Sequence, residues 1–177
     1  MLSVSVKSDY YKHCGNTLII NYCLITTFKF GAVIVEILEN SFDPWKWVKS
    51  YQDSEAVLRN DVGATTLFIG TMRDFNEGDE VQSMLLEHYP EMTDKHLAKI
   101  ANDAMQKWQL LDIAIAHRVG EIFPGDPIVC VAVWSSHRKE AYEANRMIME
   151  DLKSNVPFWK KEQLKNSSRW VESNTKG

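Results

Sequence analysis

The fold is decided by the stretch LDIAIAHRVGEIFPGDPIVCVAVW, residues 111–134. Its two ends are apolar runs rich in β-branched residues, which is typical of buried strands. Between them lies FPGD, residues 123–126, which has the proline, glycine and aspartate of a turn. The stretch therefore predicts two buried strands, at 111–120 and 127–134, joined by a short connection.

Two further strands are predicted upstream of this stretch. GATTLFIG, residues 63–70, is apolar, β-branched and bounded by glycines, which predicts a strand. VQSMLLEHY, residues 81–89, is predicted to be the second strand. The segment between them, TMRDFNEGDE, is polar and charged and contains Gly78, so we expect a loop there.

Three helices are predicted around these strands, each from a start signal and from apolar residues at helical spacing. The first should run from Pro44 to about Arg59, the second to about Trp108 and the third to about Lys153. Their predicted caps are Ser41 or Asp43 for the first helix, Thr93 for the second, and Ser135 or Ser136 for the third.

The segment VPFWKKE, residues 156–162, should be extended, because Pro157 cannot continue a helix and restricts the residue before it. The predicted order is helix, two strands, helix, two strands, helix, then one or two strands. This order indicates an α+β domain with a mostly antiparallel sheet.

Composition limits the classes of protein that the chain can belong to. A chain of 177 residues that is 45% hydrophobic is long enough to bury one core, so we expect one globular domain. A net charge of −4 disfavours a non-specific nucleic-acid binder. The chain has no apolar run of 18 residues, so no transmembrane helix is expected.

The N-terminal residues 1–32 differ from the rest and are interpreted as an extension of unknown role that could add one strand. The three cysteines form no metal-binding spacing, which indicates reduced thiols in a cytoplasmic protein without a metal site. Cys130 lies inside an apolar strand, so we expect it to be buried and inert.

Basic residues gather at the ends of the predicted elements. Arg73 follows the strand 63–70, where a salt bridge with Asp74 or Glu77 is an equally good interpretation. The pair HR at 117–118 is interpreted as structural, with a histidine that satisfies a backbone group. Two further clusters are His137 with Arg138, and Lys153 with Lys160 and Lys161.

The cluster of His137 and Arg138 suits an anion. Free N–H groups at a helix start bind phosphate, and an arginine adds bidentate contacts, although both side chains could simply face water. The lysine cluster lies beside an apolar, proline-restricted segment. A lysine that is partly desolvated there has a lowered pKa and can exchange protons, whereas the alternative is an ordinary charged strand edge.

Five motifs, in this order and spacing, resemble the large, catalytic subunit of molybdopterin synthase over residues 33 to about 172. They are GATTLFIGTMRD, LLEHYPEMTDKHL, IAHRVGEIFPGD, SSHRKEAYEANRMIMEDLK and VPFWKKE. The resemblance implies an α/β-hammerhead-type domain, residues 33–177, with an additional antiparallel subdomain. It also implies a homodimer within a heterotetramer that carries a small ubiquitin-like sulfur-carrier subunit ending in Gly-Gly at each far end.

The implied reaction moves sulfur from the carrier's C-terminal thiocarboxylate to cyclic pyranopterin monophosphate, forming the dithiolene of molybdopterin, with no cofactor. The resemblance implies that Lys153 and Lys160 are catalytic. It does not assign which of the two transfers protons and which holds charge. The substrate-binding positions are Thr71, Met72, Arg73, His137, Arg138, Lys161 and Glu162. In the family, the pair His137–Arg138 comes from the other protomer.

Two other functions compete with this one. A non-catalytic α+β domain could bind a phosphorylated metabolite and regulate a partner. An RNA-binding α+β module is disfavoured by the net charge and by the lack of an aromatic RNA-binding strand.

Overall fold

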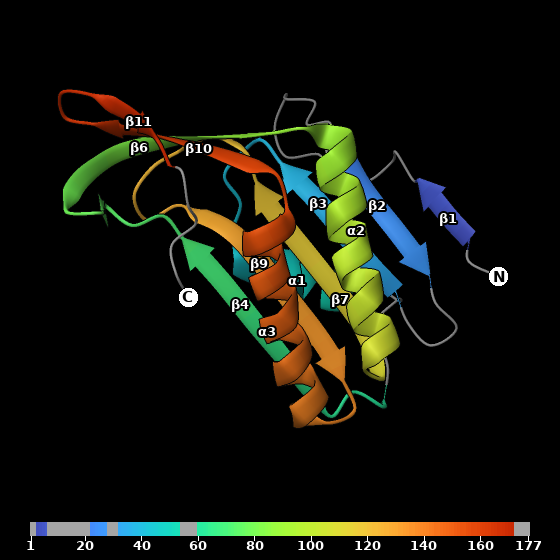
Figure 1. Cartoon of the computed structure of the whole chain (residues 1–177). Coiled ribbons are helices and arrows are strands. Elements are labelled where there is room, and N and C mark those ends of the chain that lie inside the picture. The colour runs from blue at the N-terminus through green and yellow to red at the C-terminus, as the bar shows by residue number, and fades with distance from the viewer. Residues whose placement is uncertain (1–2, 7–21, 28–31, 54–59, 172–177) are drawn as a thin grey trace.

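The computed structural model describes residues 3–6, 22–27, 32–53 and 60–171 (Figure 1). Its larger sheet has six strands in the order β1-β2-β3-β7-β9-β4. Only β3 and β7 run parallel, and the other neighbours are antiparallel. The strands are β1 (Ser3–Val6), β2 (Tyr22–Thr27), β3 (Ala32–Leu38), β7 (Leu110–Arg118), β9 (Pro127–Ser135) and β4 (Ala64–Thr71).

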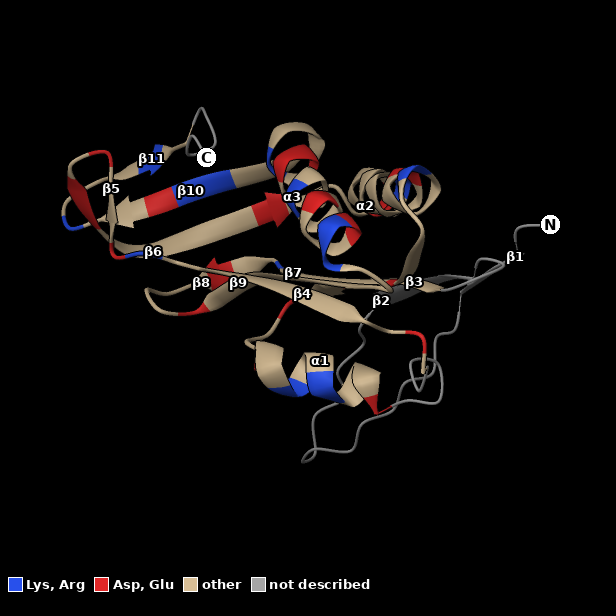
Figure 2. Ribbon diagram, turned by 90° about the horizontal axis from the view of Figure 1, so that it is seen from below, with Lys and Arg blue, Asp and Glu red and all other residues tan. Residues whose placement is uncertain are grey.

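Helices cover both faces of this sheet. α2 (Pro90–Lys107) and α3 (Arg138–Asn155) lie on one face, and α1 (Pro44–Gln52) lies on the other (Figure 2). The strands β7 and β9 are therefore buried from both sides, which explains why both read as continuous apolar runs. One apolar core lies under α2 and α3 and a second lies under α1, where Trp134 packs against Tyr51.

A second sheet stands beside α3 on the same side of the large sheet (Figure 2). Its path is β11-β10-β6-β5, with β8 also paired to β6, and every pair is antiparallel. Its strands are β5 (Phe75–Asn76), β6 (Asp79–His88), β8 (Gly120–Ile122), β10 (Phe158–Leu164) and β11 (Ser168–Trp170). The prediction of an α+β fold with an additional antiparallel subdomain is confirmed.

The predicted helix starts are right in one case and wrong in two. The Asp43 carboxylate accepts hydrogen bonds from the N–H groups of Trp45 and Lys46, as predicted. Thr93 is not a cap, because Pro90 suits the first helical position and α2 already begins there. Neither Ser135 nor Ser136 is the cap of α3, which is His137.

Further segments differ from expectation, among them the strands β3 and β8, which were not predicted. The predicted loop 71–80 contains the hairpin β5–β6, whose turn residues Glu77 and Gly78 both have positive φ angles, 52° and 93°. The N-terminal extension contributes two described strands rather than one: β2 pairs with β3, and β1 pairs with β2 as the edge strand of the large sheet. The end predicted for the first helix falls among residues 54–59, outside the described residues.

No helix in the described ranges is long and apolar enough to cross a membrane.

Candidate functional site

A cavity of about 370 Å³ lies where the end of α3 meets the small sheet and the end of β4. This volume falls in the range of small-molecule sites, about 300–1,000 Å³. The cavity brings together six of the nine residues predicted from the sequence: Thr71, Met72, Arg73, Lys153, Lys160 and Glu162.

The two lysines reach the cavity from opposite sides of a helix–strand junction. Lys153 lies in the last turn of α3, where a cation suits the helix dipole. The helix stops at Val156, which adopts an extended conformation before Pro157, and β10 begins at Phe158. Since side chains alternate along a strand, Phe158, Lys160 and Glu162 all face the cavity.

Lys160 is a half-buried ammonium group. Burial lowers its pKa from the ordinary lysine value, the nearby charge of Lys153 lowers it further, and Glu162 opposes both. A lysine with a lowered pKa can give up and regain a proton more readily than an exposed one. The predicted effect of desolvation on the lysine cluster is therefore present at Lys160.

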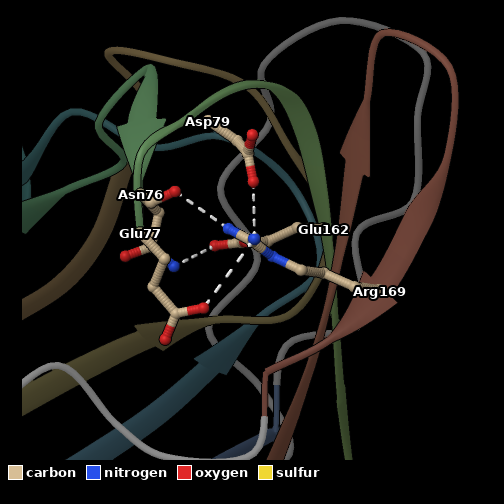
Figure 3. Close-up of polar contacts among 5 residues, drawn as sticks. All are labelled: Asn76, Glu77, Asp79, Glu162 and Arg169. Carbon is tan, nitrogen blue, oxygen red and sulfur yellow. Dashed lines mark hydrogen bonds and ion pairs between the residues drawn. The ribbon is translucent and has the colours of Figure 1, made fainter.

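Glu162 is buried at the cavity wall and is held by groups of its own chain (Figure 3). One carboxylate oxygen accepts a hydrogen bond from Asn76 Nδ2 at 2.7 Å, and the other accepts one from Arg169 Nε at 2.9 Å. Its negative charge is thus compensated by Arg169. Its predicted contact with substrate stays a prediction.

His117 also lines the cavity and is only 4% exposed. Its ring stacks on Phe158 with centroids 3.9 Å apart and an interplanar angle of 11°. Burial lowers its pKa to about 3, with a smaller contribution from the charge of Lys160, so the imidazole is neutral. Nδ1 lies 2.9 Å from the Arg118 carbonyl oxygen, which can only accept, so Nδ1 carries the proton.

The structural role predicted for His117 is thus correct, but the sequence did not place it in the cavity. Other cavity-lining residues that the sequence did not single out are Phe68, Asn76, Met149, Phe158 and Val171. Period-two alternation along β10 and a four-residue step back from Lys153 along α3 would have indicated Phe158 and Met149.

Three predicted residues lie outside this cavity. Lys161 points to the other face of β10, with its Nζ 5.7 Å from the centroid of the Trp170 ring. His137 and Arg138 are at the start of α3, whereas Lys153 is at its end. At 1.5 Å per residue the two ends are roughly 22 Å apart, so one protomer does not bring Arg138 and Lys153 together.

Cys130 is fully buried in β9, and burial raises the pKa of its thiol to about 12, which makes it inert as predicted. Cys14 lies outside the described residues, and only the backbone of Cys23 is described. No group of three or more His, Cys, Asp or Glu side chains in the described part of the chain could hold a metal ion.

The cavity can therefore bind an anion and move protons. Arg73, Lys153 and Lys160 supply positive charge, while the carboxylate of Glu162 is already paired. Apolar walls, including Met84, Leu86 and Leu152, surround these groups and lower the local dielectric, which strengthens electrostatic contacts with a ligand.

Comparisons with known proteins show which family this chain is similar to. Residues 39–155 match the family model of the MoaE protein. The molybdopterin synthase catalytic subunit of Haemophilus ducreyi is 43% identical over 143 residues, which cover 79% of this chain and 89% of that protein.

Solved structures show the same fold. The molybdopterin biosynthesis MoaE protein of Burkholderia ambifaria has a TM-score of 0.65 and 40% identity, covering 80% of this chain and 90% of that chain. A complex of subunits 1 and 2 of the molybdopterin-converting factor from Helicobacter pylori has a TM-score of 0.66 at 22% identity. The match covers 78% of this chain and 90% of that chain, and it supports the fold alone. The chain belongs to the MoaE family, the catalytic subunits of molybdopterin synthase.

Proposed function

We propose that this chain is a sulfurtransferase that forms molybdopterin by moving sulfur from a protein thiocarboxylate to cyclic pyranopterin monophosphate. The observation that carries the proposal is the convergence of Arg73, Lys153 and Lys160 on one cavity. A phosphate ester requires positive charge, and the one cysteine side chain that the structure describes, Cys130, is buried and inert. We therefore propose that sulfur arrives on another molecule.

Each transfer exchanges one sulfur atom of the carrier for oxygen. On the carrier, the C–S bond of the C-terminal thiocarboxylate breaks and a C–O bond replaces it, so the carrier ends as a carboxylate. On the pterin, a C–O bond breaks at the carbon that receives sulfur and a C–S bond forms there. Lys160, with its lowered pKa, is placed to exchange protons with the departing oxygen, and Lys153 to hold negative charge close by. The opposite assignment, in which Lys153 exchanges protons and Lys160 holds negative charge, gives the same overall reaction.

The proposed donor is a small ubiquitin-like carrier that ends in Gly-Gly. Membership of the family of molybdopterin synthase catalytic subunits supports such a partner. Two glycines suit a narrow entrance, because they bring no side chains into the cavity. We propose a cytoplasmic heterotetramer in which two copies of this chain form the centre and one carrier docks at each far end.

The site also includes Thr71 and Met72 at the end of β4, beside Arg73, as substrate contacts. We propose that His137 and Arg138 complete the cavity of a second copy, since they lie too far from the lysines of their own chain. Lys161 and Glu162 belong to the same strand as Lys160. Domain 33–177 carries all of these residues, and the role of residues 1–32 is separate from them.

The decisive experiment is conversion of cyclic pyranopterin monophosphate by thiocarboxylated carrier, with and without this protein. Molybdopterin should form only when all three components are present. A non-catalytic regulator would bind the phosphate ester and give no product even with a carrier that co-purifies with it. That result would refute the proposed reaction.

A further inference from the structure

Arg169 of the strand β11 joins four groups (Figure 3), and two of the residues that supply them, Asn76 and Glu162, line the cavity. Its Nε donates to Glu162 at 2.9 Å, its Nη2 donates to the Asn76 carbonyl oxygen at 2.9 Å, and its Nη1 donates to Asp79 at 2.8 Å. The same Nη1 lies 3.8 Å from Glu77. One guanidinium group thus ties β11 to β10 and to the β5–β6 hairpin.

The turn of this hairpin needs such support. Glu77 and Gly78 both have positive φ angles, the conformation of a two-residue hairpin turn of the I′ type. Glycine adopts it freely, but a residue with a side chain is strained there. Arg169 contacts the chain on both sides of the turn, at the carbonyl of Asn76 and at the side chain of Asp79.

The hairpin in turn fixes Arg73. On one side, Met72 is bound by two backbone hydrogen bonds to the turn at Gly125 and Asp126. On the other side, the carbonyl of Asp74 accepts a hydrogen bond from the N–H of Val81 at 2.8 Å, at the start of the hairpin's second strand. Arg73 therefore lies between two anchored points, and the second anchor belongs to the element that Arg169 holds.

Arg169 also compensates the negative charge of Glu162 in the cavity wall. Glu162 is 5% exposed and would leave a buried negative charge among the cationic groups if it were unpaired. The hydrogen bond to Glu162 raises the pKa of Arg169, so the guanidinium stays charged and compensates the carboxylate. The lysines and Arg73 then face a ligand without a competing free carboxylate.

We infer that Arg169 is a positioning residue for the anionic substrate. It acts through the groups that it binds: it holds the hairpin that anchors Arg73, and it pairs the buried carboxylate of Glu162 at the cavity wall. The identity of the anion rests on the proposed function, whereas the support of the hairpin by Arg169 does not.

The test is Arg169→Ala in the full chain, with Lys165→Ala as the matched control, because Lys165 is an exposed cation in the neighbouring β10–β11 turn. In Arg169→Ala the KM for cyclic pyranopterin monophosphate should rise about ten- to hundredfold, the loss expected for charged hydrogen bonds, with kcat changed much less. Hydrogen exchange of the amides at 76–80 should become at least about tenfold faster. The control should show neither change.

Arg169→Lys should recover part of the KM, because an ammonium can pair with Glu162 but cannot also hold Asn76 and Asp79 in fixed directions. If Arg169→Ala does not fold, Asp79→Asn removes one contact at an exposed position and should raise KM about two- to fivefold.

A lower kcat at unchanged KM would indicate fewer folded molecules and would overturn the inference, as would unchanged hydrogen exchange at 76–80. If the wild-type protein forms no product, the proposed function fails on its own. The inference is then decided by hydrogen exchange and by titration with inorganic phosphate, which Arg169→Ala should bind more weakly than Lys165→Ala.

Discussion

Two impaired variants, Arg138→Ala with weaker substrate binding and Lys160→Ala with almost no turnover, should restore activity when they share a dimer, if Arg138 serves the cavity of a second copy. α3 runs from Arg138 to Asn155, and Lys153 lies in its last turn. The roughly 22 Å between Arg138 and Lys153 along the helix axis is more than an arginine side chain can span. We therefore propose that Arg138 meets the substrate of the lysine cavity in another protomer.

The size of the effect follows from dimer symmetry. Arg138→Ala alone should lose about 1.5–3 kcal/mol of binding to the phosphate group, and Lys160→Ala alone should be nearly inactive. In a heterodimer of the two, one cavity has both defects and the other has neither. Equal mixing by chance makes half of the dimers heterodimers, so about a quarter of all cavities are intact.

The assay is molybdopterin formation by saturating thiocarboxylated carrier, using protomers with different affinity tags so that heterodimers can be purified. Purified heterodimers should reach about half of the wild-type rate per dimer, because one of the two cavities is intact. The matched control pairs Lys153→Ala with Lys160→Ala. Both defects lie in one cavity, so if each lysine is required, each cavity of that heterodimer keeps one defect. Heterodimers of Arg138→Ala and Lys160→Ala that stay as inactive as their parents would refute sharing of the cavity.

Further outcomes follow from the same cavity. Lys153→Ala and Lys160→Ala should each nearly abolish turnover without lowering the unfolding temperature, and loss of folded protein would contradict this. Lys160→Ala should even be more stable than the wild type, since burial of that ammonium group is unfavourable. Changing all three cysteines, with Cys130→Ala, should keep turnover at a cost of about 1 kcal/mol in unfolding free energy, and a folded but inactive variant would refute the sulfur route. The unfolded chain binds a proton at His117 near pH 6.5 and the folded chain only near pH 3, so the free energy of unfolding should fall as pH decreases through this window, by about 1–2 kcal/mol at pH 5.5. Denaturant titrations of His117→Phe should show a smaller loss of unfolding free energy, and the loss that remains should come from His88.

The strands and helices were predictable because their signals are local. β7, β9 and β4 appear as apolar β-branched runs, and α3 shows buried residues at helical spacing in Ala141, Ala144, Ile148 and Leu152. Caps were less predictable, because several residues near a helix start compete for the same role. Pro90 overrode Thr93 for this reason.

The hairpin at 75–80 was missed because its turn contains Glu77 at a positive φ angle, which sequence statistics disfavour. The contacts that stabilise this turn come from Arg169, which is 90 residues away from Asp79 along the chain. A periodicity analysis covers one element at a time and cannot register such a pair.

By itself, then, the sequence determined the α+β class, the order of the three helices and of the strands β4, β6, β7, β9 and β10, the inert Cys130 and the identity of the cationic residues. Only the tertiary structure decided which cations share a cavity: it joined Arg73 to Lys153 and Lys160, and separated Arg138 and Lys161 from them. The reason is physical. Residue type and spacing set the local backbone conformation, whereas a cavity is formed by side chains from distant segments whose directions depend on how sheets and helices pack.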